Sequence, residues 1–317
     1  MTHSKHEGHG ARLQGAKPVI PVAAGCLVND RNEVLIAQRP IGKIAAGKWE
    51  FPGGKIEANE TPRGALDREL REELGIDVRV ARPLIRVRHE YSDRIVILDT
   101  WLVSAFAGEL HPHDNQQFAW VARGGLLRWD LLAADRPIVN ALQLPTDYVF
   151  TPPDANMDWI ATRLDRLPRG ALLRLRLPAL DDSAYAGIAR RVIPPARELG
   201  LKVIVDRQVD VGADGSHTTS RSFRLPSNNG WRIASCHSAE ELERVRSAGF
   251  DAAVLGPVQH TATHPDSAPI GWDRFKTLAG EAGLPVYAIG GVGPRDRDDA
   301  FAHYAQGVAG ISAFWRE

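Results

Sequence analysis

The sequence contains only two cysteines among its 317 residues, Cys26 and Cys236. Two thiols so far apart in the chain provide neither a disulfide framework nor a cysteine zinc site, and they are typical of a reducing, cytoplasmic compartment. There is also no excess of positive charge, because 39 Lys and Arg balance 39 Asp and Glu. This balance argues against direct binding to nucleic acid or to a membrane surface, since both favour a basic excess.

Long apolar runs are absent too. None reaches the roughly 18 residues of a membrane-spanning helix, and segment 1–17 lacks the continuous apolar stretch of a secretory signal. We expect this segment to be a disordered tail. At about 150 residues per domain, the length predicts two domains. The composition shifts near Leu144–Asp147, which places the domains at 18–144 and 147–317.

The N-terminal half shows the pattern of a mixed α/β domain. Two apolar runs, Val19–Val28 and Glu33–Ala37, flank a polar turn and predict a β-hairpin. Thr61-Pro62 predicts the start of a helix and Gly75 its end. Further strands are expected at Leu84–Val87, Ile95–Val103 and Phe118–Val121, and a further helix at Pro137–Leu142.

The C-terminal half alternates short apolar runs with stretches that have a helical pattern, which predicts an eight-stranded β/α barrel. The roughly 170 residues available are fewer than the ~200 of a full barrel, so we expect the first or fourth unit to lack a complete helix. The helical stretches are Ser183–Leu199, Ala239–Ala248 and Trp272–Ala282. The apolar runs are Tyr148–Thr151, Leu172–Arg176, Lys202–Asp206, Gly215–Thr218, Ile233–Cys236, Ala252–Gly256, Val286–Gly290 and Val308–Ser312.

Residues 54–76 carry the strongest chemical signal in the chain. They fit the pattern Gly-x5-Glu-x7-Arg-Glu-U-x-Glu-Glu-x-Gly-U, in which U is aliphatic; chance gives such a match on the order of once in ten million positions. Glu69, Glu72 and Glu73 share one helix face at spacings i, i+3 and i+4. Three carboxylates so close repel one another unless a cation neutralises them, and Mg²⁺ prefers such oxygen ligands, with Mn²⁺ as an alternative.

Four other residues complete this candidate catalytic group. Glu60 can join the carboxylates from the preceding loop, and Arg68 can orient a glutamate through a charge-assisted hydrogen bond. Gly53 and Gly54 allow the backbone to approach a metal or a phosphate where a Cβ would clash. A solvent-exposed acidic helix is the alternative interpretation of a bare Glu-x-x-Glu-Glu, but it does not explain the glycines and Glu60 at matching distances.

This pattern is the Nudix box, and the surrounding sequence closely resembles MutT-type 8-oxo-dGTP diphosphatases over about residues 19–143. The resemblance implies that Phe51, Pro52, Gly53 and Gly54 line the nucleotide site. It implies nucleotide contacts for Arg39 and, in the pair Asp93-Arg94 that follows Tyr91, for Arg94. It also implies that Gly53, Glu69, Glu72 and Glu73 bind the metal, with Glu69 the first candidate for general base and Glu60 the second.

Two departures from this family concern chemistry. The family recognises the purine through an Asn-x-Pro segment, whereas this chain has Asp135-Arg136-Pro137, and an ionised aspartate only accepts hydrogen bonds. Asp114 replaces a family glutamate, which puts its direct metal contact in doubt. Among aromatic residues we expect Trp49, Trp101 and Trp120 to be core residues, and Phe51 to contact substrate.

The C-terminal half resembles thiamine-phosphate synthase and its TenI-like relatives. The match is carried by Tyr148–Thr151, Ala213–His217, Gly256-Pro257 with Thr261–Thr263, and Ala288–Val292. Loops after strands 7 and 8 of such barrels hold phosphate, which implies a phosphorylated small ligand at Gly290, Gly291, Gly310 and Ile311.

The departures in this half fall on the residues that synthase chemistry requires. The segment Arg174–Pro178 has no lysine, Asp206 alone is a poor Mg²⁺ site, and Thr218–Ser220 replaces a metal-binding segment. We therefore expect a barrel that binds a ligand without acting as a synthase.

Together these observations predict a Nudix α/β/α sandwich followed by a trimmed (β/α)8 barrel. The expected function is Mg²⁺-dependent hydrolysis of oxidised purine nucleoside triphosphates to the monophosphate and pyrophosphate, which cleans the DNA precursor pool. Two alternatives stay open. One is a Nudix reaction on another substrate, such as a nucleotide sugar or a thiamine-related diphosphate. The other is a regulatory or bifunctional protein in which the barrel dominates.

Overall fold

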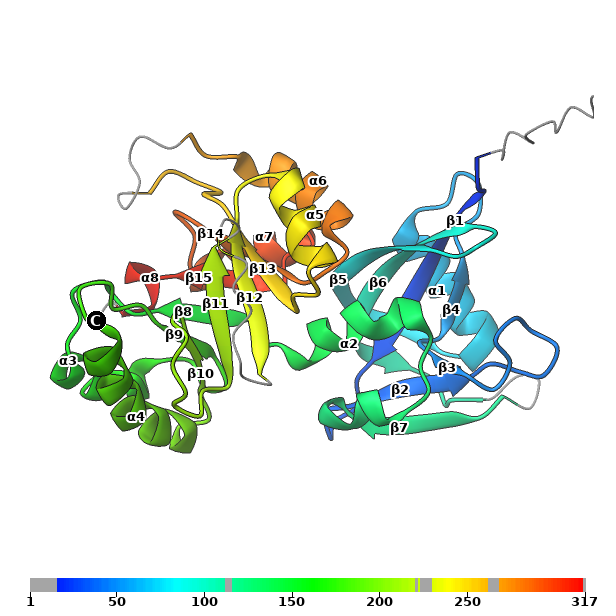
Figure 1. Ribbon diagram of the computed structural model, residues 1–317. Helices are drawn as coiled ribbons and strands as arrows, with labels where there is room; N and C mark the ends of the chain where they lie inside the picture. Colours follow the sequence, from blue (N-terminus) through cyan, green and yellow to red (C-terminus); the bar gives the residue numbers. More distant parts are fainter. Residues whose placement is uncertain (1–15, 112–115, 220–221, 223–229, 262–267, 316–317) are drawn as a thin grey trace, which may run out of the picture.

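The computed structural model describes residues 16–111, 116–219, 222, 230–261 and 268–315. The expected disordered tail lies outside the described residues, apart from Ala16 and Lys17. Figure 1 shows two lobes side by side, an N-terminal lobe that contains β1 to β7 and a C-terminal lobe that contains the remaining strands. Within the described segments, no helix is both long and apolar enough to span a membrane.

The N-terminal lobe contains two β-sheets, with strand orders β4-β1-β6-β5 and β3-β2-β7. Strands β1 and β6 run parallel, and the other neighbours are antiparallel. The strands are β1 (Val19–Leu27), β2 (Glu33–Gln38), β3 (Trp49–Glu50), β4 (Gly53–Lys55), β5 (Asp77–Glu90), β6 (Ile95–Ala107) and β7 (Phe118–Ala122).

The predicted β1–β2 hairpin is wrong. The chain does reverse at the expected turn, where Asn29 Oδ1 accepts hydrogen bonds from the backbone N–H groups of Arg31 and Glu33. The two strands then separate into different sheets, joined by a bridge between Val28 and Val34. Instead, β1 pairs with β6 along its whole length, and this parallel pair forms the centre of the larger sheet.

Two helices cover opposite faces of this sheet, which confirms the α/β/α sandwich. Helix α1 (Pro62–Leu74) packs Leu66 and Leu70 with Ala23 and Leu27 of β1. Helix α2 (Arg136–Gln143) packs on the other face, with Cys26 and its neighbours. The alternation of side chains along β1 therefore supplies both cores. Short 3-10 helices η1 (Arg123–Arg128) and η2 (Ala133–Asp135) precede α2.

The boundaries of α1 follow from its terminal residues, as the sequence predicted. Thr61 Oγ1 accepts a hydrogen bond from the N–H of Gly64 at 3.1 Å, so it caps one of the unpaired donors of the first turn. Gly75 ends the helix in the left-handed region, with φ of 71°. These two caps fix the position along the chain at which the glutamates of α1 begin.

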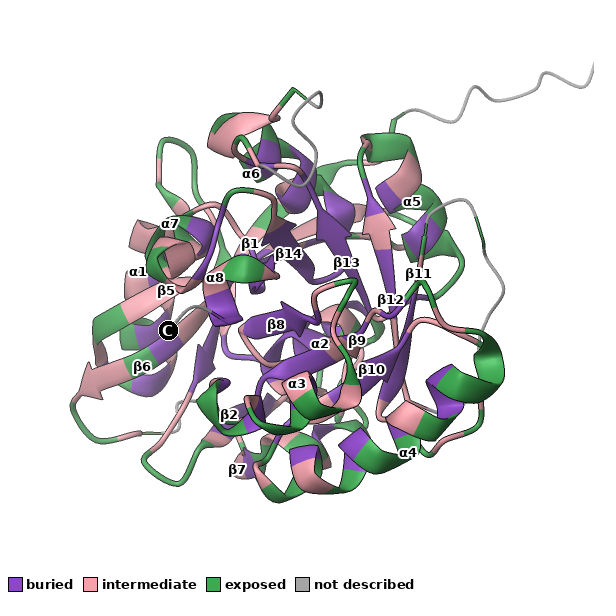
Figure 2. Cartoon of the chain, turned by 90° about the vertical axis from the view of Figure 1, so that its left-hand side faces the viewer, coloured by how far each residue is buried: buried purple, intermediate pink, exposed green. Residues whose placement is uncertain are grey.

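The C-terminal lobe is a closed barrel of eight parallel strands, which confirms the predicted fold. The strands are β8 (Asp147–Phe150), β9 (Leu172–Leu175), β10 (Lys202–Val205), β11 (Gly215–Thr219), β12 (Trp231–Cys236), β13 (Ala252–Leu255), β14 (Val286–Ile289) and β15 (Gly307–Gly310). The helices are α3 (Met157–Ala161), α4 (Asp182–Glu198), α5 (Ala239–Ser247), α6 (Gly271–Ala282), α7 (Arg297–Ala302) and α8 (Ser312–Trp315), with η3 (Leu164–Arg166) and η4 (Pro294–Asp296). Figure 2 shows the strands largely buried and the outer helix faces exposed.

The barrel is shortened in the first unit, as predicted, and also in the third, which was not predicted. The first unit has only the five-residue α3, as expected. The third connection, residues 206–214, contains no helix and runs directly from β10 to β11. In the fourth connection, residues 220–221 and 223–229 lie outside the described residues.

The two lobes are joined by specific contacts as well as by the chain. Helices α6 and α7 pack against β5. The Tyr304 hydroxyl donates to Asp99 Oδ2 at 2.7 Å, and the guanidinium of Arg82 lies 3.8 Å from the ring centre of Phe301. The Gln306 side-chain amide donates to two backbone carbonyls at the end of α2, of Ala141 and Leu144. The end of α2 is therefore anchored to the barrel.

Candidate functional site

The glycine turn at the start of β4 brings the backbone against the carboxylates of α1. Gly53 pairs with Ala24 of β1 and has φ of 145°, a conformation that L side chains rarely adopt. A Cβ on Gly53 would overlap the carbonyl oxygen of Ala23, and one on Gly54 would overlap the carboxylate of Glu69. The predicted requirement for glycine at both positions therefore has a steric cause.

Glu73 lies on the other side of the same turn. Its Oε2 accepts a hydrogen bond from the N–H of Gly53 at 3.0 Å. The pKa of Glu73 is raised to about 7, chiefly by burial and also by the charges of Glu69 and Glu50, while the Gly53 hydrogen bond acts in the opposite direction. The turn is thus flanked by two carboxylates, of Glu69 and Glu73, in a site where negative charge is not fully compensated.

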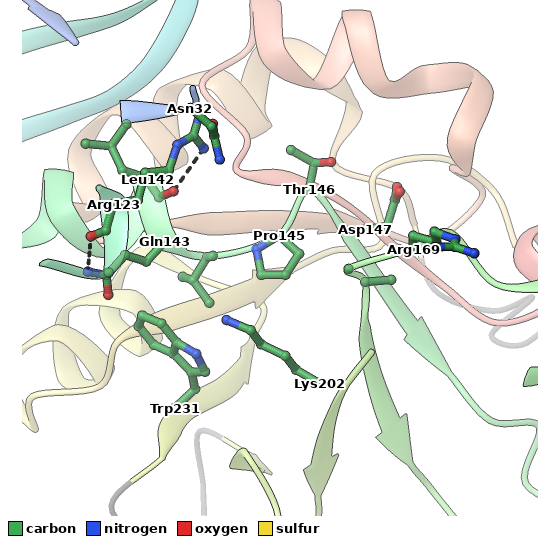
Figure 3. Close-up of a pocket in the computed structure, with 14 residues that line it drawn as sticks. Asn32, Arg123, Leu142, Gln143, Pro145, Thr146, Asp147, Arg169, Lys202 and Trp231 are labelled. Carbon is green, nitrogen blue, oxygen red and sulfur yellow. Dashed lines mark hydrogen bonds between the residues drawn. The ribbon is translucent and has the colours of Figure 1, made fainter. Parts of the chain in front are cut away.

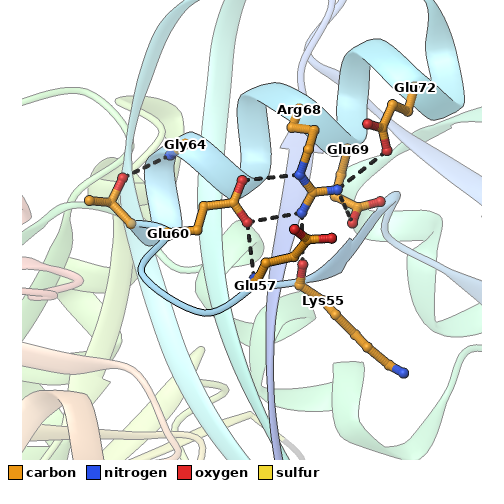
Figure 4. A network of polar contacts seen from close by, with 8 residues as sticks. Lys55, Glu57, Glu60, Gly64, Arg68, Glu69 and Glu72 are labelled. Carbon is orange, nitrogen blue, oxygen red and sulfur yellow. Dashed lines mark hydrogen bonds and ion pairs between the residues drawn. The ribbon is translucent and has the colours of Figure 1, made fainter.

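Arg68 connects the remaining predicted catalytic residues (Figure 4). Its Nε and Nη2 donate to the two oxygens of Glu60 at 3.0 and 2.9 Å. Its Nη1 donates to Glu69 Oε1 at 2.7 Å and to Glu72 Oε2 at 3.3 Å, and Nη2 also reaches the carbonyl of Lys55 at 2.9 Å. The hydrogen bonds from Arg68 hold the pKa of Glu60 below its ordinary value. Arg68 therefore orients Glu69, as predicted, and it also fixes Glu60.

The four predicted metal ligands are not equivalent in the structure. Glu69 and Glu73 adjoin the Gly53-Gly54 turn, whereas the Glu72 side chain is 60% exposed and its contact is with Arg68. Within the described parts of the chain, no three His, Cys, Asp or Glu side chains converge closely enough to hold a metal ion. The ligand set Gly53, Glu69, Glu72 and Glu73 stays a prediction. Asp114 lies outside the described residues.

Asp135, the candidate base-recognition residue, is only 3% exposed. Its Oδ2 has no hydrogen-bond partner among the described residues. Burial raises the pKa of Asp135 well above its ordinary value, and the charge of Glu50 raises it further. The raised pKa extends to higher pH the range in which the carboxyl is protonated and has both a donor and an acceptor, whereas the ionised form only accepts.

Arg39 connects this region to the glycine turn. Its guanidinium forms an ion pair with Glu50 through Nη1, and its Nε donates to the carbonyl of Ile44 at 2.7 Å. Burial also raises the pKa of Glu50. The charge of Glu50 in turn raises the pKa of Asp135 and that of Glu73. Sequence reasoning missed Glu50, because no pattern marks a glutamate on the two-residue strand β3.

The other predicted substrate residues differ in exposure. Arg94 lies with its guanidinium 4.9 Å from the ring centre of Tyr91 and pairs with Asp93 at 2.7 Å. Burial raises the pKa of Tyr91, and so does the charge of Asp135, which places Tyr91 near the candidate base pocket. The side chain of Phe51 is 4% exposed and packs in the apolar core of the sandwich, and its contact with substrate stays a prediction. The ring of Trp49 meets that of Trp129 edge to face, as core packing predicts.

The carboxyl ends of the barrel strands hold the predicted phosphate site. Gly290 and Gly291 have φ of 91° and 70°, and a Cβ on either would collide with the segment Pro257–His260. Nearby in the fold, Arg174 pairs with Asp206 at 3.2 Å and lies 4.8 Å from the ring centre of Phe150. Asp206 is therefore neutralised by an arginine, which weakens it further as a metal ligand.

His217 forms a buried hydrogen-bond chain inside the barrel that the sequence did not predict. Its Nδ1 lies 2.9 Å from the Tyr148 hydroxyl and its Nε2 lies 2.7 Å from Ser235 Oγ. Burial lowers the pKa of His217 well below its ordinary value, so the neutral ring is favoured. These two hydrogen bonds link strands β8, β11 and β12 inside the barrel.

Comparisons with known proteins give a consistent result for each lobe. The model of the NUDIX domain matches residues 23–141, and that of thiamine monophosphate synthase matches residues 148–314. The CTP pyrophosphohydrolase of Escherichia coli is 42% identical over 39% of this chain and 90% of its own length. The 8-oxo-dGTP diphosphatase of Proteus vulgaris is 48% identical over 30% of this chain and 84% of its own length.

The second lobe has relatives of its own. A putative thiamine-phosphate synthase of Aquifex aeolicus is 28% identical over 55% of this chain and 99% of its own length. The relatives of the two lobes therefore belong to different families, and each of these matches covers one lobe.

Proposed function

Since the chain belongs to the Nudix family in its N-terminal half and to the thiamine monophosphate synthase family in its C-terminal half, we propose that it is a nucleotide pyrophosphohydrolase with a ligand-binding barrel. Its substrate in this proposal is an oxidised purine nucleoside triphosphate such as 8-oxo-dGTP. The observation that carries the proposal is the Gly53-Gly54 turn flanked by the carboxylates of Glu69 and Glu73.

These residues suit a hard divalent cation. Their donors are carboxylate oxygens, and the pKa of Glu73 is raised by burial and by neighbouring carboxylates, whose negative charge a cation would neutralise. Glu69, Glu73, the Gly53 carbonyl and Glu72 would hold Mg²⁺ or Mn²⁺. When bound, the metal would polarise a phosphate oxygen and lower the pKa of a water molecule.

The other residues of the site have roles that follow from their contacts. Arg68 holds Glu69 in one orientation, so Glu69 can accept a proton from an attacking water without first reorganising. Glu60 is a weaker candidate for general base, because two hydrogen bonds from Arg68 and one from the N–H of Glu57 stabilise its ionised form. Its role in this proposal is to position Arg68.

Base recognition is assigned to Asp135. A neutral carboxyl there offers one O–H donor and one acceptor, which is the combination that an asparagine amide offers. The N–H at position 7 of an oxidised purine would then donate to the acceptor oxygen of Asp135, and the Asp135 O–H would be available to donate to a neighbouring acceptor of the base. This restores the hydrogen-bonding capacity that the replacement of asparagine by an ionised aspartate removes.

A second candidate substrate is a pyrimidine nucleoside triphosphate, because a relative that is 42% identical is named as a CTP pyrophosphohydrolase. Values of kcat/KM for 8-oxo-dGTP, dGTP, CTP and thiamine diphosphate, measured with full-length protein and Mg²⁺, separate the candidates. The proposal expects 8-oxo-dGTP to have the highest value. A higher value for CTP or for thiamine diphosphate would reject the oxidised-purine assignment and keep the hydrolase.

The alternative of a barrel-dominated regulator has its own test. In a strain that lacks its 8-oxo-dGTP diphosphatase, the full chain should lower the mutation rate. Glu73→Gln should abolish this effect, whereas substitutions at Gly290 and Gly291 should leave it intact. The reverse result would assign the main role to the barrel.

A further inference from the structure

A groove of about 610 Å³ lies between the two lobes, away from both sites described above (Figure 3). The N-terminal lobe contributes Asn32 and Arg123 to its wall, and the linker 142–147 forms its back. The barrel contributes Arg169, Lys202 and Trp231. Its volume is in the range of pockets that hold small organic ligands, which occur preferentially at domain interfaces.

The barrel residues of this groove lie at the amino ends of the strands. Lys202 is the first residue of β10, Trp231 is the first of β12, and Arg169 lies three residues before β9. Gly290 and Gly310 lie at the carboxyl ends, where ligands of such barrels bind. The groove is therefore on the opposite face of the barrel from the predicted phosphate site.

The groove has uncompensated positive charge. Neither Lys202 nor Arg169 has a side-chain hydrogen bond or ion pair within the described residues. Asp147 is the acidic residue of the lining, and both its oxygens are taken by Arg297, at 2.7 and 2.8 Å. With that carboxylate neutralised, an anion entering the groove meets two available cations.

The groove also has an aromatic surface and an ordered wall. Trp231 is half-buried and packs against the core inside the barrel, which limits the motion of its ring. Gln143 Nε2 donates to the carbonyl of Arg123 at 2.7 Å, and Arg123 Nη1 donates to the carbonyl of Leu142 at 3.1 Å. These reciprocal bonds fix the wall on the side of the N-terminal lobe.

Lys202 lies between the other two barrel residues of the groove. Its N–H donates to the carbonyl of Ala171 at 3.0 Å, two residues from Arg169, and a single strand, β11, separates β10 from the strand of Trp231. A phosphate held by Lys202 would therefore place the rest of its ligand on the Trp231 side, toward which Figure 3 shows the Lys202 ammonium directed, with the charge of Arg169 on the other side. Aromatic rings bind flat heteroaromatic groups by stacking, and a neighbouring cation binds the phosphate.

We propose that this groove is a binding site for a phosphate monoester that carries a flat heteroaromatic ring. Two sources supply this chemistry, a nucleoside monophosphate released by hydrolysis in the N-terminal lobe or a phosphorylated heteroaromatic ligand of the barrel family. Binding in the groove does not require hydrolysis, so it stands independently of the proposed function.

The test is equilibrium binding to the full-length protein in EDTA, where hydrolysis is off. The probes are GMP and thiamine monophosphate, with ribose 5-phosphate as the monoester without an aromatic ring. Photolabelling with 8-azido-GMP, followed by peptide mapping, locates the bound nucleotide. We expect label on the peptide that contains Trp231, and whichever aromatic monoester binds more tightly identifies the source.

Matched variants assign the binding to the groove. The double variant Lys202→Gln/Arg169→Gln should weaken binding at least about tenfold, whereas Arg128→Gln/Arg166→Gln, which removes two exposed charges elsewhere, should not. Trp231→Phe should retain binding and Trp231→Leu should lose it, and hydrolysis in Mg²⁺ should be unchanged in the double variant. Absence of binding by both aromatic probes, ribose 5-phosphate binding that the Lys202→Gln/Arg169→Gln variant weakens as much as GMP binding, or equal affinity in the two double variants would overturn the proposal.

Discussion

Arg68 holds Glu60 through two parallel hydrogen bonds, from Nε to Oε1 at 3.0 Å and from Nη2 to Oε2 at 2.9 Å, while its Nη1 reaches Glu69. A guanidinium can make these contacts at once because its donors lie in one rigid plane. The orientation of Glu69 therefore depends on the shape of the Arg68 side chain as well as on its charge.

Arg68→Lys is expected to lower kcat by about ten- to a hundredfold, because an ammonium keeps the charge but loses the two-pronged geometry. Thermal unfolding should change little, since the network is partly exposed. Arg63→Lys is the control, because Arg63 forms a helix-surface pair with Asp67 on the same helix. An active Arg68→Lys variant would show that charge alone suffices.

Glu73→Gln is expected to lower turnover by at least about a hundredfold, because the glycine turn loses one of its two carboxylates. The fold should persist, since the amide replaces a buried carboxylate without loss of volume. Steady-state kinetics and circular dichroism measure the two effects. Glu57→Gln, an exposed position of the preceding loop, should be fully active. Retained turnover in folded Glu73→Gln would remove Glu73 from the metal set.

Asp135→Asn should preserve the preference for 8-oxo-dGTP over dGTP, because an amide has the donor and acceptor of a protonated carboxyl. Asp135→Ala should reduce that preference more than it slows hydrolysis, since polar partners in a buried site set selectivity. The measurement is the ratio of kcat/KM for the two nucleotides. Loss of preference in the asparagine variant would mean that an ionised, acceptor-only carboxylate reads the base.

The raised pKa of Asp135 also predicts how stability depends on pH. The unfolded chain loses this proton near pH 3.9, whereas the folded chain keeps it to higher pH. Stability from this group is therefore full below about pH 3.9 and is lost as pH rises towards the folded-state pKa. The difference in Tm between Asp135→Asn and the unaltered protein should accordingly grow from pH 4 to pH 8. A constant difference would show that the carboxyl is ionised throughout.

The barrel should form no thiamine phosphate. That synthesis needs cations around a diphosphate leaving group, but Arg174 is paired with Asp206 and no lysine occurs in the segment of β9. Full-length protein should still bind a simple phosphate ester at the Gly290-Gly291 turn. A coupled synthase assay and calorimetry measure the two properties. Clear synthase turnover would make the protein bifunctional.

Local chemistry explains which parts of the fold were predictable. The Thr61 cap and Gly75 determine where α1 begins and ends through contacts with residues close to them in sequence, and both ends were predicted correctly. The β1–β2 hairpin failed because Asn29 signals a reversal without specifying the partner of β1. That partner, β6, begins at Ile95, and the pairing depends on both faces of β1 being buried by helices.

The site was predictable to a similar degree. Glu69 and Glu73 are four positions apart on α1, so the sequence could predict that their carboxylates lie on the same helix face. Burial is a property of the whole fold, so the sequence did not reveal that the pKa of Asp135 is raised or that the ring of Phe51 is buried. Glu50 was missed for the same reason, since its raised pKa comes from burial, and His217 was missed because Tyr148, its hydrogen-bond partner, is distant in sequence.

The most direct test of the account is the identity of the products that the full-length protein forms from 8-oxo-dGTP in Mg²⁺. Phosphorus NMR of the reaction should show 8-oxo-dGMP and pyrophosphate in equal amounts, and Glu73→Gln should form neither at a comparable rate. Release of inorganic phosphate with 8-oxo-dGDP, or no turnover by folded protein, would contradict the account.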